Sequence, residues 1–383
     1  MTRPVIFGAA LDPDDGPARV AQKAEYARLD GTAASVGAPR DPYQVLVPYL
    51  VNGADAPYRA AGVVSTPSWL TPFPAAADLP RLRPEAFRAF VQEGGCAEYA
   101  RGVESFVADL ASTGPIAMLG VDHSATGGVV SALSAIHGPK DLALIVVDAH
   151  LDAVSDEARN GLLAFAREHP DPAYRLDPGA YAPLAGTHNS YNCGSFLRHL
   201  VEWGVLPAQN LLVLGVADKP HPRLNQIADP RVRGFLNEYE WLAAHGAKVI
   251  DAATLAEPAR AAAVAAAAVA RLPGHRAYLS WDLDVGSQRA LVGVRFAELP
   301  GLDEACLRAL AHGISEGLLA GGRQLVGLDV MEFDFYAAGA ELPGGKDRTY
   351  DIAHAILTEF RPALGTAGRS VHAGATRSNQ KCG

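Results

Sequence analysis

Cysteine is scarce in this chain, and the few cysteines that occur are scattered along it. Their spacing matches neither a zinc site nor a disulfide framework. Sparse, unpaired cysteines are typical of a reducing compartment, in which thiols stay free. We therefore expect a cytoplasmic protein and assign no catalytic role to any of the four, Cys96, Cys193, Cys306 and Cys382.

A long apolar segment and a cluster of basic residues are also missing. No stretch of about 18 uninterrupted apolar residues marks a membrane span. The apolar run Val5–Leu11 breaks at once into Asp12–Asp15, too early for a secretion signal. Acidic residues outnumber basic ones by 42 to 33, which disfavours nucleic acid or an anionic membrane as the partner. We expect a small-molecule partner instead. A positively charged molecule would suit the excess of acidic residues.

The chain does contain enough apolar material for one large core, arranged as alternating strands and helices. Of its 383 residues, 49% are hydrophobic. The alanine-rich segment Glu257–Arg271 is a predicted helix, with its proline in the first turn. The alternation predicts an α/β fold with three layers, αβα, around a mostly parallel central sheet. The predicted strands are Val45–Leu50, Pro115–Gly120, Leu142–Val147, Asn210–Gly215, Ala247–Ile250, Arg276–Ser280 and Gln324–Leu328.

We expect a single domain over residues 1–364, with an N-terminal extension over about 1–110. The extension is rich in proline and small residues, as in Ser65–Pro74, which would suit a segment that covers a site or forms a subunit boundary. Residues 365–383 are polar, contain glycine and lack periodicity, so a flexible tail is expected there.

The most informative motif is Asp148–Asp152, which reads Asp-Ala-His-Leu-Asp and directly follows the strand-like run Leu142–Val147. Side chains two residues apart at a strand end point to the same side, so three of them can converge on one site. Carboxylate and imidazole together suit a divalent metal. Burying this much charge without a metal or other partners is expensive, so the motif predicts a metal site.

Two other strand ends carry residues of the same kinds. Asp282 and Asp284 follow the strand Arg276–Ser280, and His123 follows Pro115–Gly120. Taken singly, each has an ordinary explanation, because an Asp-x-Asp pair often caps a helix or lies in a solvated turn, and the histidine could also cap a helix. Functional residues of parallel sheets gather at the carboxyl ends of strands. Three such motifs at strand ends therefore favour one shared site.

In this order, the motifs Gly120–Ser124, Asp148–Asp152 and Ser280–Asp284 resemble those of the arginase/agmatinase (ureohydrolase) superfamily of dinuclear metal hydrolases. The resemblance implies two divalent metal ions per chain, by family usage Mn²⁺, although Ni²⁺ or another transition metal would also suit these ligands. It also implies a homo-oligomer, a trimer or a hexamer. The implied ligands are Asp148 and Asp282 as bridges, His123 and Asp152 on one metal, and His150 and Asp284 on the other.

A further match to this family lies at Leu325–Glu332, where the resemblance makes Glu332 the contact for a substrate guanidinium group. Two loops depart from the family pattern, Val285–Gln288 and Thr187–Asn192. The second loop nevertheless offers polar side chains as candidate substrate contacts, namely His188, Asn189, Ser190 and Asn192.

The resemblance implies hydrolysis of a C–N bond in a guanidino compound, giving urea and an amine. Two adjacent divalent metals lower the pKa of a bridging water toward neutrality, and the resulting hydroxide attacks the guanidinium carbon. Asp152 is the favoured proton donor to the departing amine, and His188 could relay protons from solvent.

Two other functions stay open. The altered loops would also suit a related metallohydrolase that acts on an amidine, formimidoyl or amide substrate. A third interpretation is a non-catalytic subunit of an assembly that retains only the fold. Arg295, Arg289 and Glu298 are interpreted as surface charges rather than specificity residues, since most charged side chains lie at the surface.

Overall fold

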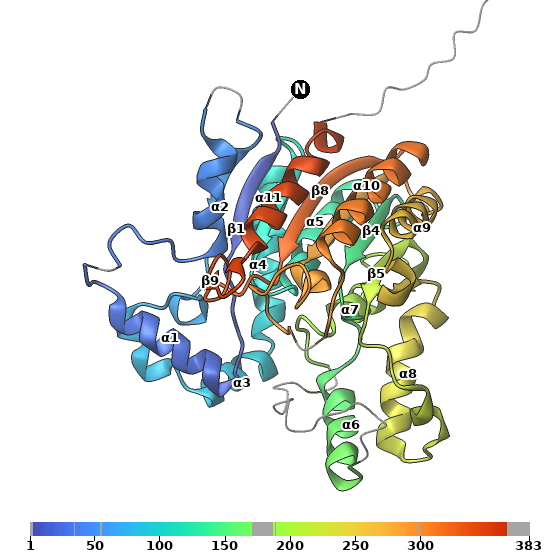
Figure 1. The fold of residues 1–383 in the computed structure, drawn as a ribbon, viewed down its shortest axis with the longest axis horizontal. Coiled ribbons are helices and arrows are strands. Elements are labelled where there is room, and N and C mark those ends of the chain that lie inside the picture. Colours follow the sequence, from blue (N-terminus) through green and yellow to red (C-terminus); the bar gives the residue numbers. More distant parts are fainter. Residues whose placement is uncertain are drawn as a thin grey trace, which may run out of the picture.

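The computed structural model in Figure 1 describes residues 3–33, 35–53, 56–170, 187, 189–297 and 299–365. Its centre is an eight-stranded sheet in the order β2-β1-β3-β8-β7-β4-β5-β6, and every neighbouring pair is parallel. The strands are β1 (Val5–Ala9), β2 (Arg59–Val63), β3 (Ile116–Gly120), β4 (Leu142–Val147), β5 (Leu211–Val216), β6 (Lys248–Asp251), β7 (Arg276–Asp282) and β8 (Gln324–Met331), and a separate hairpin pairs β9 (Glu341–Leu342) with β10 (Gly345–Lys346).

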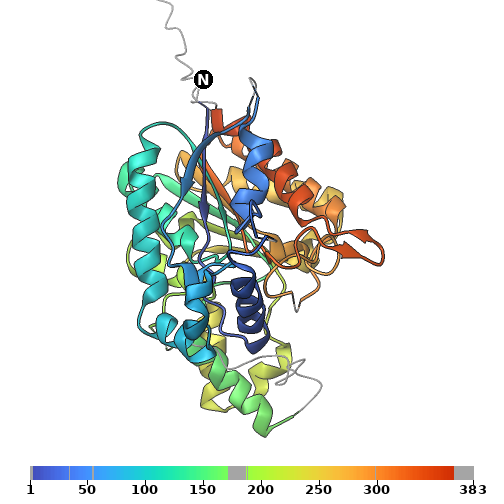
Figure 2. The same ribbon diagram turned by 90° about the vertical axis from the view of Figure 1, so that its left-hand side faces the viewer.

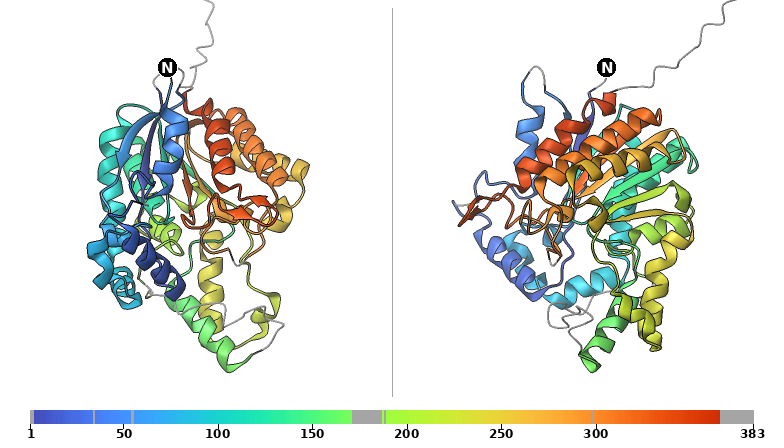
Figure 3. Two further views of the ribbon diagram at one scale, coloured as in Figure 1. Left: turned by 60° about the vertical axis from the view of Figure 1, so that its left-hand side comes forward. Right: turned by 45° about the vertical axis from the view of Figure 1, so that its right-hand side comes forward.

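Helices cover both faces of this sheet, as the two sides of Figure 2 and the left view of Figure 3 show. Successive side chains of a strand point to opposite faces, so Ile145 and Val147 of β4 join one core and Leu144 and Val146 join the other. The first core includes residues of α2, α9, α10 and α11, and the second includes residues of α4, α5 and α7. The predicted three-layer α/β class is therefore confirmed. The helices are α1 (Pro17–Leu29), α2 (Pro42–Val51), α3 (Pro84–Gln92), α4 (Gly95–Ala111), α5 (Ala125–His137), α6 (Asp156–Glu168), α7 (Phe196–Glu202), α8 (Pro230–Ala244), α9 (Pro258–Ala270), α10 (Glu304–Ala320) and α11 (Thr349–Phe360).

Six of the seven predicted strands are present, but the one predicted at Val45–Leu50 is wrong, because this segment lies in helix α2. Asp41 caps the helix by accepting a hydrogen bond from the Gln44 backbone N–H at 2.8 Å. Leu46 and Leu50 are both buried, and their spacing of four residues is that of one helix face. The apolar residues of this segment therefore form one buried face of a helix, although their run also matches the pattern of a buried strand.

The short apolar run at Val5–Leu11 supplies β1, which lies inside the sheet between β2 and β3. Both β1 and β2 fall within residues 1–110, so the predicted extension shares the main sheet. The division into one domain with an extension stays a prediction. The predicted tail lies outside the described residues except for its first position.

Helix α9 occupies Pro258–Ala270, as its alanine content predicted, with the proline in its first turn. The longest described helices, α4 and α10, have 17 residues each. Among the described residues, no helix combines the length and the hydropathy needed to cross a bilayer.

The strand order brings four distant parts of the chain together at the centre of the sheet. β3 and β4 follow one another in sequence, yet β8 and β7 lie between them. Leu119 of β3 aligns with Val330 of β8, which aligns with Trp281 of β7, and Trp281 aligns with Val147 of β4. The residues that follow these four strands therefore emerge in one row at the carboxyl edge of the sheet, where open α/β sheets bind ligands.

Gly327 of β8 lies where the core leaves no room for a methyl group. A Cβ atom there would lie 2.7 Å from Ile116 Cγ1 and 3.0 Å from the Ile116 carbonyl oxygen. We expect Gly327→Ala to lower the free energy of unfolding by about 1–3 kcal/mol, because overpacking forces side chains and backbone to shift. Urea denaturation measures the change.

Gly102, on the exposed side of α4, is the matched control, because a Cβ atom at this position would meet no described atom within 4 Å. Gly102→Ala should raise the free energy of unfolding by about 0.5–1 kcal/mol, since alanine loses less backbone entropy in a helix. Shifts of the same sign in both variants would contradict this account of the packing around β8.

Candidate metal centre

Side chains that suit a metal ion meet at the ends of three central strands. β4 leads into the Asp-x-His-x-Asp motif, β7 ends in the Asp-x-Asp motif, and β3 leads into the histidine that follows it. Their ligand atoms form two groups, and within each group all atoms lie within 4.8 Å of one another. The first group is His123, Asp148, Asp152 and Asp282, and the second is Asp148, His150 and Asp284.

His123 lies at the centre of the first group. Its Nδ1 atom is 3.2 Å from Asp148 Oδ2. The Oδ2 atoms of Asp152 and Asp282 are both 3.1 Å from the same nitrogen. Among the described residues, neither His123 Nδ1 nor Asp148 Oδ2 has a hydrogen-bond partner. Because buried polar atoms are almost always paired, these converging atoms fit a cation held between them.

A hydrogen-bond chain behind His123 determines which ring nitrogen faces the group. Ser280 Oγ donates to Asp329 Oδ1 at 2.7 Å and lies 2.8 Å from His123 Nε2. The hydroxyl has one proton, so it accepts from Nε2–H and leaves the Nδ1 lone pair toward the carboxylates. Thr126 and Tyr278 donate to Asp329 Oδ2. Sequence analysis missed Asp329, although a carboxylate inside a strand with a buried pattern was its signal.

The second group is built around His150. Its Nδ1 atom lies 2.7 Å from Asp284 Oδ2, and Asp284 Oδ1 accepts a hydrogen bond from the Ala149 backbone N–H at 3.0 Å. Asp148 belongs to both groups, which suits a carboxylate that bridges two cations. Asp282, expected as the other bridge, lies only with the first group.

The crowded carboxylates shift the proton affinities of the whole cluster. Burial, together with Asp152 and Asp282, raises the pKa of Asp148 well above its usual value. Burial and the neighbouring Asp284 likewise raise the pKa of Asp282. Burial alone would lower the pKa of His123, but the surrounding carboxylates raise it well above its usual value. These shifts express an excess of negative charge, which divalent cations would neutralise.

Left-handed backbone is concentrated at this edge of the sheet. Among the described residues, four non-glycine positions have a positive φ: Asp152 at 51°, Glu332 at 63°, Phe296 at 55° and Gln288 at 61°. Such conformations cost free energy and persist where the surrounding structure imposes them, often at functional sites. Two of the four are a predicted ligand and the predicted substrate contact.

The loop with the other predicted substrate contacts is only partly described, because His188 lies outside the described residues. Asn189 is exposed. Ser190 is buried, and its Oγ accepts a hydrogen bond from a backbone N–H of the same loop. Asn192 donates through Nδ2 to Asp156 Oδ2 at 2.7 Å. Ser190 thus bonds within the loop and Asn192 ties the loop to α6, and their contact with a substrate stays a prediction.

Glu332 lies at the end of β8, beside the first ligand group. Its Oε1 accepts a hydrogen bond from the His123 backbone N–H at 2.8 Å, and its Oε2 lies 3.4 Å from Arg295 Nη1. The interpretation of Arg295 as a surface charge is wrong, because its side chain is 2% exposed and also lies 3.3 Å from Asp122 Oδ2. Burial raises the pKa of Glu332 to about 8, although the Arg295 charge opposes the shift. The sequence carried no signal that this loop arginine would fold inward.

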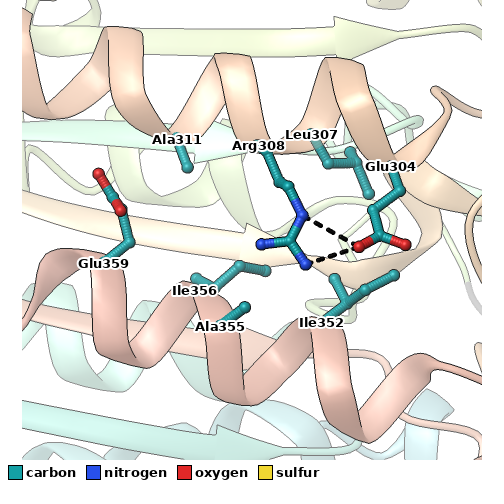
Figure 4. Close-up of a pocket in the computed structure, with 8 residues that line it drawn as sticks. All are labelled: Glu304, Leu307, Arg308, Ala311, Ile352, Ala355, Ile356 and Glu359. Atoms are coloured by element: carbon teal, nitrogen blue, oxygen red, sulfur yellow. Dashed lines mark hydrogen bonds and ion pairs between the residues drawn. The ribbon is translucent and has the colours of Figure 1, made fainter.

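A groove elsewhere on the molecule is separate from the candidate metal centre. It lies between α10 and α11 and is lined by apolar side chains that include Leu307 and Ile356 (Figure 4). Arg308 forms an ion pair with Glu304 within the same helix. None of the residues that line this groove belongs to either ligand group.

The fold and the two overlapping ligand groups define a three-layer α/β protein with a candidate dinuclear metal centre. A sequence model of the arginase family matches residues 87–360. The chain therefore belongs to the arginase family. No curated protein matches the sequence significantly.

Solved structures with a similar fold come from several enzymes. Proclavaminate amidino hydrolase from Streptomyces clavuligerus is 18% identical, with a TM-score of 0.54 over 95% of this chain and 93% of its own. Arginase from Bacillus caldovelox is 15% identical, with a TM-score of 0.54 over 96% and 99%. Trypanosoma cruzi formiminoglutamase with Mn²⁺ is 14% identical, with a TM-score of 0.54 over 95% and 94%.

At these identities the structural likeness establishes the fold alone. Family membership supports a hydrolase of the ureohydrolase type that acts on C–N bonds. The histidine and aspartate groups fit the dinuclear metal site that is typical of this family.

The raised pKa values predict how the metal-free protein responds to pH. Glu332, Asp148, Asp282 and His123 all hold a proton more tightly when folded. The stability that they contribute is therefore complete below their unfolded pKa values and is lost as the pH rises through the folded ones. The lowered pKa of Asp284 makes stability increase with pH, but the four groups with raised pKa values act in the opposite direction.

We accordingly expect chelator-treated protein to have a lower Tm at about pH 8 than at about pH 5.5. Added Mn²⁺ should raise the Tm more at the higher pH, because deprotonated ligands bind metal better. Thermal unfolding followed by circular dichroism tests both statements. A metal-free protein that is more stable at the higher pH would show that the carboxylate cluster does not dominate.

Proposed function

We propose that this chain hydrolyses a C–N bond of a guanidino compound to urea and an amine, with two divalent metal ions as cofactors. The observation that carries the proposal is the convergence of two ligand groups on one shared carboxylate, Asp148. Two adjacent ions in such a site polarise the electrophile and lower the pKa of a water molecule toward neutrality. Carboxylates and imidazoles suit Mn²⁺, and Ni²⁺ is an alternative. His123, Asp148, Asp152 and Asp282 would hold one ion, and Asp148, His150 and Asp284 would hold the other. A second bridge through Asp282 is proposed from the family alone.

The six proposed ligands differ in how far their side chains are exposed to solvent. The side chains of Asp152 and His150 are 8% and 11% exposed, whereas those of the other four proposed ligands are at most 3% exposed. The greater exposure of these two side chains supports an approach of the substrate past Asp152 and His150. This placement supports Asp152 as the donor of the proton to the departing amine.

The proposed reaction balances with water as the only co-substrate. The water oxygen forms a bond to the guanidinium carbon, the C–N bond to the amine breaks, and the amine leaves with a proton. We propose that His188 relays protons between Asp152 and solvent. Glu332 is the proposed contact for the guanidinium group, supported by its place at the next strand end and by its hydrogen bond to His123 N–H.

A specific observation favours a second candidate function, hydrolysis of an amidine, formimidoyl or amide substrate. The carboxylate of Glu332 already faces the guanidinium of Arg295, so its capacity for a second guanidinium is reduced. A non-catalytic subunit is the remaining alternative. Assembly into a trimer or hexamer is proposed from the family alone.

Urea release from a panel of guanidino compounds, with bound metal counted in the same samples, tests the proposal. The protein is loaded separately with Mn²⁺ and Ni²⁺, and about two ions per chain are expected. Urea production at this metal content would support the leading function. Ammonia or a carboxylate as the product would favour the second candidate, and a chain that binds no metal would be a non-catalytic subunit.

Replacement of the shared ligand should remove metal and activity together. Because Asp148 belongs to both groups, we expect Asp148→Asn to lower bound metal from about two ions to less than one and to reduce turnover more than about 100-fold. The matched control is Asp156→Asn, which alters a buried carboxylate outside both groups. Elemental analysis of both variants decides the point, and full metal retention in Asp148→Asn would exclude a bridging role.

A further inference from the structure

The carboxylate proposed to receive a substrate guanidinium already faces one that belongs to the protein. Glu332 Oε1 is engaged by the His123 backbone N–H. Glu332 Oε2 has no hydrogen-bond partner among the described residues, but Arg295 Nη1 lies 3.4 Å from it. Both side chains are almost completely buried. The local negative charge of Glu332 is therefore offset from within the chain.

The backbone fixes Arg295 in this position. Its N–H donates to the Glu332 carbonyl oxygen at 3.0 Å, and the Asp334 N–H donates to the Gly293 carbonyl oxygen at 2.9 Å. Between these two bonds, Val294 and Phe333 form an antiparallel bridge. The loop after β7 thus lies against the residues that follow β8, which directs the side chain of Arg295 toward Glu332.

The ion pair with Glu332 is long, and Arg295 has other partners. Nη1 also lies 3.2 Å from the Val121 carbonyl oxygen and 3.3 Å from Asp122 Oδ2. All of these contacts are made by Nη1, and Arg295 Nε has no hydrogen-bond partner among the described residues. The guanidinium therefore does not form the two-point fork that makes arginine–carboxylate pairs strong. Asp122 can therefore continue to compensate the charge of Arg295 when Glu332 binds another cation.

We propose that Arg295 is a specificity-determining residue, which competes with guanidinium cations for Glu332. A guanidinium from solvent must share this carboxylate with Arg295 and places a second positive charge beside it in a buried site, where like charges repel strongly. A neutral amide brings no such charge. Arg295 therefore weakens guanidinium binding relative to the binding of neutral C–N substrates. The inference rests on the proposed function in that it takes Glu332 as a substrate contact.

Binding of small probes to the metal-loaded protein tests the proposal without requiring turnover. We expect Arg295→Gln to raise the affinity for methylguanidinium at least about tenfold, which corresponds to about 1.4 kcal/mol. Its affinity for acetamide should change less than about twofold. Isothermal titration calorimetry measures both. An unchanged methylguanidinium affinity, or an equal gain for acetamide, would overturn the proposal.

Two matched variants separate charge from general disturbance. Arg295→Lys keeps the positive charge, so its methylguanidinium affinity should stay within about threefold of the wild-type value. Arg19→Gln removes another mostly buried guanidinium, one that forms two 2.8 Å hydrogen bonds with Asp334 instead of facing Glu332. This variant should bind both probes as the wild type does. A tenfold gain in Arg19→Gln would show that any lost positive charge has the same effect.

A second measurement decides the matter even if Arg295→Gln does not fold. Glu332→Gln in the otherwise wild-type protein should lower methylguanidinium affinity at least about threefold, because it removes the shared carboxylate and leaves the positive charge of Arg295 in place. Its affinity for acetamide should change less than about twofold. An unchanged methylguanidinium affinity would show that the cation does not share Glu332 with Arg295 and would overturn the proposal. Failure of the proposed function gives a different result, namely metal-loaded protein that binds the probes as expected but hydrolyses neither guanidino compounds nor amides.

Discussion

Repulsion among buried carboxylates is the constraint on which the rest of the structure depends. Asp148, Asp152 and Asp282 approach the same nitrogen of His123 to within 3.2 Å. Such a cluster is stable only if positive charge balances it and if the scaffold resists its spreading apart. The central sheet provides the resistance, because its middle strands are buried on both faces and joined to their neighbours by parallel hydrogen-bonded ladders. The dense core and the candidate metal centre are therefore parts of one arrangement.

The support for the cluster extends one layer into the sheet. Asp329 receives three hydroxyl hydrogen bonds and, through Ser280, sets the ring orientation of His123. A ligand held in this way loses little freedom when a metal binds, which favours affinity. The left-handed backbone of Asp152 belongs to the same design, since the chain turns sharply where it must present a second carboxylate to one point. Local strain is thus located where binding can offset it.

Around Glu332 the arrangement is different, because charge is balanced within the protein. The loop that brings Arg295 inward is a continuation of β7, the strand that supplies two of the proposed ligands. With Arg295 in the role proposed above, changes in this loop would alter substrate preference without moving the proposed metal ligands, which lie at or directly after the strand ends.

The sequence by itself determined six of the strands and helix α9, because these follow from local rules, and it predicted the six proposed ligands from strand-end motifs and a family resemblance. Side chains alternate along a strand, ligand types cluster at its end, and alanine favours a helix over its own length. Only the tertiary structure decided that β8 and β7 separate β3 from β4, that Asp329 supports His123, and that Arg295 turns inward to Glu332. These depend on contacts between residues far apart in the chain. Segment Val45–Leu50 also shows that a local pattern can be ambiguous, because its apolar residues suit both a strand and a helix. The Asp41 cap and the burial of one face identify it as a helix.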